Sequence, residues 1–250
     1  MRHDFIDRYS NLGSPVHRLD PRVKVIAALA AIVIIVSEPR FGELLPFLFH
    51  ALPVMAVLVF SRLPVGYVMK RLLIVSPFIL MASLFYPLSV YITDREVFHT
   101  TGMSAVSAGF IILLKSMLAV IVLIVLSSTE RFHRLLLAFR RLKVPVLVTT
   151  ISALLYRYIF LIADETLKTT RARESRTPGR LRMGRIRVTG NQVAVIFLRS
   201  WERSQIIYQS MLSRGFSGEY PDMTALQIKG TDLVFSGLFI ALLLSVRIFM

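Results

Sequence analysis

The sequence has no cysteine, and it has only 15 Asp and Glu against 30 Lys and Arg. The absence of cysteine excludes disulfides, thiolate nucleophiles and thiolate metal ligands, but it does not fix the compartment. Only 18% of the residues are charged and 55% are hydrophobic, whereas soluble domains have about 25% charged residues. This composition excludes an ordinary soluble domain and predicts an all-α polytopic membrane protein.

Motifs for enzymatic chemistry are also missing. The chain has no Gly-x-x-x-x-Gly-Lys-Ser/Thr sequence, so we expect it not to hydrolyse ATP itself. No nucleophile motif accompanies its serines. The five histidines are scattered without ligand spacing, which argues against a metal site in this chain; they are His3, His17, His50, His99 and His133. We therefore expect no catalytic residue and no metal ligand here.

Long apolar runs divide the chain into a membrane block and a basic segment. Spans are expected at about 23–37, 44–60, 72–92, 105–127 and 233–250. Lys and Arg alternate between rich and poor connections, which predicts a cytoplasmic N-terminus. The expected organisation is about five transmembrane helices and a cytoplasmic or interfacial platform of amphipathic coupling helices. Its parts are a cytoplasmic N-terminal segment (1–22), a four-span block (23–127), the platform (128–230) and a final span (231–250).

Local signals refine the membrane block. Pro21 should hold Asp20 outside the helical region. Lys24 should snorkel toward water from the inner end of the first span. Pro77 and Pro87 should kink or break the third span, and 93–104 is expected to be a loop.

Lys115 lies near the middle of the fourth span, where a charge costs at least about 2.5–3.5 kcal/mol on insertion scales. It could contact a partner membrane subunit or an internal carboxylate. A shifted helix end that lets Lys115 reach the interface is an equally open alternative.

The platform carries much of the positive charge, with 18 Lys and Arg against 7 Asp and Glu between 130 and 229. Helices are expected at 130–142, 146–176 and 191–213. Residues 146–163 are almost entirely apolar and contain Arg157. Because a crossing there would contradict the charge alternation, we expect this stretch to lie along or dip into the inner interface. Five and six spans both stay open.

The third platform helix carries apolar residues at alternating steps of four and three, which predicts a coiled-coil-like seam. The seam consists of Ala194, Leu198, Trp201, Tyr208 and Leu212. Gly215 should end this helix. A Ser-Arg pair closes each of two platform helices, in Ser175-Arg176-Thr177 and in Ser213-Arg214-Gly215. An arginine at a helix end can form bidentate bonds to carboxylates or bind backbone carbonyls of a partner.

Three further stretches give the chain a family resemblance. They are His-Arg-Leu-Asp-Pro-Arg at 17–22, Tyr156-Arg157-Tyr158 followed by Asp164-Glu165, and Met-Leu-Ser-Arg-Gly-Phe at 211–216. Together they resemble the transmembrane T component (EcfT/CbiQ family) of energy-coupling factor (ECF) ABC transporters. The likeness covers nearly the whole chain and is greatest to the CbiQ group, which serves cobalt and nickel uptake and is associated with cobalamin biosynthesis.

The resemblance implies a non-catalytic transporter subunit in the cytoplasmic (inner) membrane. Its implied partners are two ABC-type ATPase subunits and a CbiM/NikM-like substrate-binding membrane subunit, with or without a small CbiN-like subunit. ATP and Mg would be bound by the ATPases, and the cobalt or nickel ion by the substrate-binding subunit. Anionic lipid is a further expected partner of the basic platform; nucleic acid is not.

In that family two Ala-Arg-Gly-like triplets end the coupling helices and dock into the two ATPases. By position they fall on Ser175-Arg176-Thr177 and Ser213-Arg214-Gly215, with Ser in place of Ala in both and Thr in place of Gly in the first. Ala172-Arg173-Glu174 is an alternative for the first triplet. Arg157, Asp164, Glu165 and Trp201 are expected to be structural residues of the platform.

Two other functions stay open on residues alone. A membrane-bound enzyme acting on lipid or phosphate esters could use the arginines between Arg180 and Arg187 for anions, with Asp164 or Glu165 as acid or base. A passive scaffold would use the platform only to bind anionic lipid, and Arg176 and Arg214 would then be no more sensitive than other arginines.

Overall fold

The structure is a computed structural model that describes residues 9–10, 12–38, 45–93, 95–176, 185–218 and 228–249. These residues form helices and connections without any strand, so the all-α prediction is confirmed for the described chain. The chain divides into two compact units. One unit comprises residues 139–224, and the other comprises 2–138 together with 225–250.

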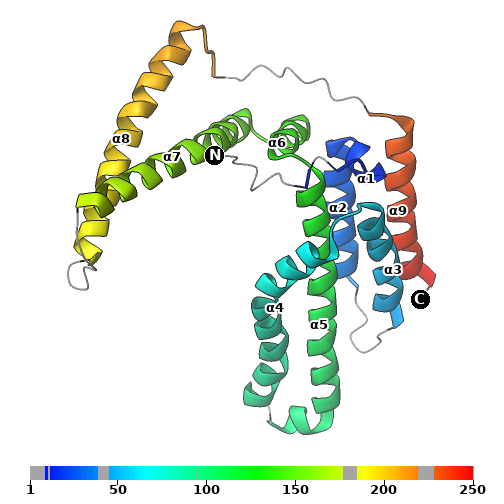
Figure 1. The fold of residues 1–250 in the computed structure, drawn as a ribbon. Coiled ribbons are helices and arrows are strands. Elements are labelled where there is room, and N and C mark those ends of the chain that lie inside the picture. Colours follow the sequence, from blue (N-terminus) through cyan, green and yellow to red (C-terminus); the bar gives the residue numbers. More distant parts are fainter. Residues whose placement is uncertain are drawn as a thin grey trace. The chain divides into compact units, whose positions relative to one another are not determined.

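The larger unit is organised around one long central helix. Its elements are α1 (Pro15–Arg18), α2 (Pro21–Val36), α3 (Leu45–Phe60), α4 (Val65–Thr93), α5 (Arg95–Thr129), most of α6 (Phe132–Arg141), and α9 (Gly230–Phe249). Helix α5 packs against α2, α3 and α4, and α9 closes the bundle against α2 and α3 (Figure 1). Segments at the two ends of the sequence are therefore neighbours in this bundle.

Small residues let these helices approach closely. Ala28 and Ala31 of α2 are buried in a cluster with Ile35, Val54 of α3 and Leu243 of α9. Between membrane helices, small side chains allow van der Waals packing that lipid cannot supply. The opposite surfaces of α2, α3 and α4 expose large apolar side chains, as lipid-facing helices do.

Within the described residues, four helical segments are long and apolar enough to cross a membrane: Val65–Ile92, Val106–Thr129, Val146–Arg176 and Gly230–Ile248. Three of them correspond to the expected third, fourth and final spans. The first two expected spans are helices of 16 residues each, α2 and α3. At about 1.5 Å per residue each is about 24 Å long, shorter than the hydrocarbon core of about 30 Å. The segment 146–176 also qualifies by length and composition, so six crossings stay possible.

The described part of the N-terminal segment is packed into one end of the bundle. Val16 and Leu19 lie in an apolar cluster with Val125 of α5, and the rings of Tyr9 and Tyr67 are 4.3 Å apart. Asp20 has extended backbone angles and accepts a hydrogen bond from the backbone N–H of Arg22 at 2.9 Å, so it caps α2 before Pro21. The expected turn at Asp20 is confirmed.

One expectation for the membrane block is wrong, and of the two outcomes expected for its prolines the break does not occur. Residues 95–104 are helical and extend α5, where a loop was expected from their polar composition. Pro77 and Pro87 do not break α4, which is one helix that bends along its length (Figure 1). Pro87 cannot donate to the carbonyl four residues earlier, that of Ser83. A Cβ added to Gly109 of α5 would lie 2.7 Å from this carbonyl oxygen, so glycine is what allows α5 to approach.

The smaller unit contains α7 (Val146–Arg176) and α8 (Arg185–Ser213). Helix α7 is continuous, as expected. Helix α8 begins at Arg185 and not near 191, so Arg185 and Arg187 belong to a helix and not to a basic loop. Arg180 and Arg182 lie outside the described residues. Helix α6 ends at the expected place, where Lys143 adopts a left-handed conformation with φ of 68°.

Candidate functional site

The two arginines singled out by the sequence stand at the C-terminal ends of α7 and α8. Arg176 is the last residue of α7, and Arg214 directly follows the last residue of α8. Both side chains are exposed. Among the described residues, neither arginine makes a side-chain hydrogen bond or an ion pair. Two guanidinium groups are thus presented to solvent at helix ends; Thr177 of the first triplet lies outside the described residues.

The end of α8 has a defined geometry. The N–H of Phe216 donates to the carbonyl of Met211 at 3.0 Å, and the N–H of Gly215 donates to Leu212 at 2.9 Å. This pair of bonds is a Schellman motif, and Gly215 supplies its left-handed residue with φ of 80°. Gly215 ends the helix as expected. Arg214 is therefore held on a hydrogen-bonded turn and not on a fraying end.

The serines of the two triplets behave alike. Ser175 Oγ donates to the carbonyl of Ala172 at 3.0 Å, and Ser213 Oγ donates to that of Gln209 at 2.9 Å. Each hydroxyl thus bonds within its own helix. The arginine is left as the outward-directed polar group of each triplet.

The separation of the two helix ends follows from how α7 and α8 pack. Arg173 of α7 contacts Gln192 of α8, while Glu165 contacts Arg199, so the helices run antiparallel. From Gln192 to Arg214 the chain rises about 33 Å along α8. Arg176 lies one turn beyond Arg173 in the opposite direction. The two arginines are therefore roughly 35 Å apart, at opposite ends of the helix pair.

The other platform residues singled out by the sequence have different surroundings. Glu165 is part of an ion pair, with its Oε1 at 2.8 Å from Arg199 Nη1. Asp164 is half-buried. Arg157 is exposed, and its guanidinium lies 5.9 Å from the ring centroid of Tyr158. Among the described residues, no three His, Asp or Glu side chains come together.

The predicted seam on α8 does not face α7. Leu198, Trp201 and Tyr208 are 59%, 59% and 51% exposed. The less exposed residues of α8 follow a different stripe, with Gln192, Ile196, Ser200, Ile207 and Met211 half-buried. The helix has apolar residues on two faces, and α7 covers the face that the predicted seam does not include. The predicted seam is an exposed apolar face in this chain.

A groove opens where α7 and α8 separate. It has a volume of about 1060 Å³ and is lined by both helices, including Leu154, Tyr158 and Leu161 of α7 and Ile207 and Met211 of α8. Figure 1 shows the two helices meeting near the end of α7 and diverging from there. The helix pair is thus joined at one end and open at the other.

Lys115 is buried inside the larger unit, with 7% of its surface exposed. Its Nζ donates to the carbonyl oxygens of Val36 at 3.2 Å and Glu38 at 2.7 Å, and it lies 5.5 Å from the ring centroid of Phe47. These carbonyls lie at and just after the end of the short helix α2, whose last residue is Val36. Because helix-end carbonyls need partners in lipid, Lys115 supplies donors that water would supply elsewhere. Its contact with a partner subunit stays a prediction.

Sequence reasoning missed a buried ion pair at the end of the bundle where the N-terminal segment packs. Lys24 does not snorkel to water; its side chain is 6% exposed and its ammonium pairs with Glu130, which follows α5. Lys24 also donates to the carbonyls of His17 at 3.3 Å and Thr129 at 3.5 Å. Arg134 of α6 lies 3.6 Å from the other carboxylate oxygen of Glu130. One ammonium therefore joins α1, α2 and the connection between α5 and α6.

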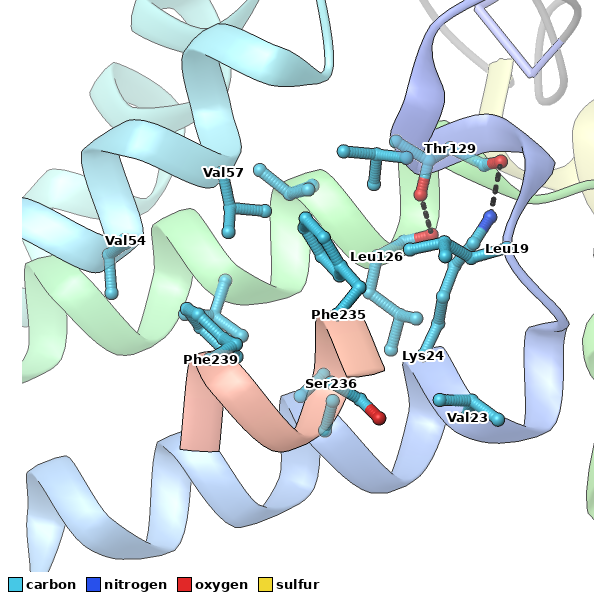
Figure 2. A pocket seen from close by; sticks show the side chains of 15 residues that line it. Leu19, Val23, Lys24, Val54, Val57, Leu126, Thr129, Phe235, Ser236 and Phe239 are labelled. Atoms are coloured by element: carbon cyan, nitrogen blue, oxygen red, sulfur yellow. Dashed lines mark hydrogen bonds between the residues drawn. The ribbon is translucent and has the colours of Figure 1, made fainter. Parts of the chain in front are cut away.

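A small apolar cavity of about 60 Å³ lies beside this pair. Figure 2 shows Phe235 and Phe239 of α9 on one side of it, and the ammonium of Lys24 turned away toward Thr129. The ammonium of Lys24 is held among carbonyl oxygens and Glu130.

The sequence of this chain is similar to known membrane proteins. A family model described as "Cobalt transport protein" (CbiQ) matches residues 13–226. An uncharacterized protein of Methanocaldococcus jannaschii is 26% identical over 240 residues, covering 92% of this chain and 81% of that protein.

Two relatives carry functional names. The energy-coupling factor transporter transmembrane protein EcfT of Ruminiclostridium cellulolyticum is 26% identical over 185 residues, covering 68% of this chain and 67% of its own. The cobalt transport protein CbiQ of Rhodobacter capsulatus is 29% identical over 94 residues, covering 38% of each chain.

Proposed function

Because the chain belongs to the CbiQ family of cobalt transport proteins, we propose that it is the energy-coupling transmembrane subunit of an ECF-type importer. In this role it passes conformational change from two ATPases to a substrate-binding membrane subunit. It is a multi-pass membrane component of a transporter family, and the proposal assigns it no catalysis of its own. ATP and Mg are bound by the ATPases.

The observation that carries this proposal is the pair of exposed arginines on ordered helix ends. Arg176 and Arg214 have no partner among the described residues, and they stand at opposite ends of one antiparallel helix pair. Two like ends roughly 35 Å apart suit two copies of one partner, each offering acceptors for a guanidinium. Movement of the two copies relative to each other then reorients α7 and α8.

We assign cobalt, or nickel, as the transported ion on the strength of the family description and of the name of the R. capsulatus relative. The ion is recognised by the substrate-binding subunit and not by this chain. The charge alternation supports a cytoplasmic N-terminus and an inner-membrane location, with the basic platform facing anionic lipid.

The test is co-purification of the chain with its ATPase from detergent. We expect Arg176→Glu and Arg214→Glu to lose the ATPase, because each places a carboxylate where the partner offers acceptors. Arg171→Glu and Arg203→Glu are matched controls: both arginines are exposed on α7 and α8, and they precede Arg176 and Arg214 by five and eleven residues. Equal retention of the ATPase by all four variants would refute the docking model.

A further inference from the structure

A polar cluster joins α7 to α8 and is not explained by docking itself. Gln192 of α8 donates from Nε2 to Thr170 Oγ1 at 2.7 Å and accepts at Oε1 from Arg173 Nη1 at 2.9 Å. Arg199, two turns further along α8, pairs with Glu165 of α7 at 2.8 Å. We call these five residues the clasp. We propose that the clasp fixes the crossing of α7 and α8, and so the separation of Arg176 and Arg214.

The hydrogen bonds of the clasp have one consistent direction. Thr170 Oγ1 already donates its hydrogen to the carbonyl of Thr166 at 2.8 Å, so it can only accept from Gln192. Arg173 can only donate, so it must face the amide oxygen. The side-chain amide of Gln192 is therefore oriented by a donor and an acceptor one turn apart on α7. Among the other residue types, only asparagine carries the same amide, on a side chain that is one methylene shorter.

The spacing of the clasp makes it specific for one register. Gln192 and Arg199 are seven residues apart and share a face of α8, while Glu165 and Arg173 are eight apart on α7. Sliding one helix by a turn would break both contacts at once. Two helices joined by one contact could rotate about it, whereas two contacts between α7 and α8 fix the direction in which the helices cross.

Apolar packing cannot supply this constraint over the whole helix pair. Beyond the clasp the helices separate around the groove of about 1060 Å³, and their apolar residues there are only partly covered. The clasp thus lies where α7 and α8 meet, and the separation of the two helices on the far side of the groove can change. This makes Gln192, Glu165 and Arg199 positioning residues; they act through the two helix ends and need not touch the ATPases.

The consequence for coupling rests on the proposed function, but the clasp itself can be tested without any partner. The chain has no cysteine, so Glu174→Cys and Gln209→Cys allow two spin labels to be placed on exposed sites of α7 and α8. Pulsed electron–electron distance measurement on the full chain in nanodiscs should give one narrow distribution near about 30 Å. Gln192→Leu combined with Arg199→Gln should broaden and shift it. Arg171→Gln, exposed on α7, is the control.

Graded and rescuing variants separate positioning from a general loss of structure. Gln192→Glu keeps an acceptor for Arg173 but loses the donor to Thr170, so its broadening should be smaller than that of Gln192→Leu. Exchanging the charges with Glu165→Arg and Arg199→Glu should restore a narrow distribution that either single change disturbs. A distribution unaffected by Gln192→Leu with Arg199→Gln would overturn the clasp, and it would leave the docking result of Arg176→Glu and Arg214→Glu untouched.

With the ATPases present, clasp variants should retain the partner but transport less per ATP hydrolysed. If the docking model is wrong, Arg176→Glu and Arg214→Glu should instead leave ATPase binding unchanged. Clasp variants that transport with unchanged efficiency despite a broadened distance distribution would overturn the assigned role in coupling.

Discussion

Removing one member of the Lys24–Glu130 pair should destabilise the larger unit far more than removing both. The two side chains are 6% and 1% exposed, so neither charge can be solvated when its partner is lost. Breaking a buried pair from one side costs about 3–5 kcal/mol, whereas replacing both members is often close to neutral. The pair thus predicts strong coupling between the two substitutions.

The surroundings make the two single changes unequal. In Lys24→Met, Glu130 keeps only Arg134 at 3.6 Å, and the carbonyls of His17 and Thr129 lose their shared donor. We expect a loss of about 4 kcal/mol. In Glu130→Gln the amide oxygen can still accept from Lys24, so about 2–3 kcal/mol is expected. The double variant should lose about 1–2 kcal/mol for the unpaired carbonyls, which gives a coupling energy of about 4–6 kcal/mol.

The assay is equilibrium unfolding in mixed micelles titrated with sodium dodecyl sulfate, followed by far-ultraviolet circular dichroism of the helices. Lys70→Met is the control, because Lys70 is exposed at the start of α4 and should change the free energy of unfolding by less than about 0.5 kcal/mol. Additive effects of the two single substitutions would refute the reasoning, since they would mean that each charge is solvated independently.

Three further results are expected. Burial lowers the pKa of His17 below its usual 6.5, and its Nε2–H donates to the carbonyl of Tyr9. As the pH falls below about 6.5, the unfolded chain therefore binds a proton at His17 before the folded chain does, and the stability of the fold should decrease. Thermal unfolding between pH 7.5 and 5 should show this decrease, and it should be less steep for His17→Gln. Lys143→Gly should raise the free energy of unfolding of α6 by about 1 kcal/mol in detergent titrations, because glycine adopts φ of 68° without strain. Gly109→Ala should lower stability by about 1–3 kcal/mol through collision with the carbonyl of Ser83, while Gly66→Ala, which has open space around it, should not.

Features carried by local sequence were predicted well. Hydropathy located α4, the apolar part of α5, and α9, because a run of about 20 apolar residues has few alternatives to a membrane helix. Asp20 before Pro21 and Gly215 after α8 were placed correctly, since each depends on the backbone preferences of one or two neighbouring residues.

Features that depend on contacts across the chain were not predictable. Lys24 and Glu130 are 106 residues apart, and nothing local distinguishes a buried lysine from one that snorkels to water. Lys115 could be recognised as costly, but its acceptors at the end of α2 became visible only in the folded bundle. On α8, apolar residues occupy two faces, and periodicity cannot tell which face α7 covers.

The most direct test of the central claim is the dissociation constant between the chain in nanodiscs and its purified ATPase pair. Two linked docking points predict that Arg176→Glu and Arg214→Glu each weaken binding by about 100-fold through lost avidity, and that the double variant abolishes it. Arg171→Glu and Arg203→Glu should bind like the natural chain. A dissociation constant unchanged by either end variant would contradict coupling through two helix ends.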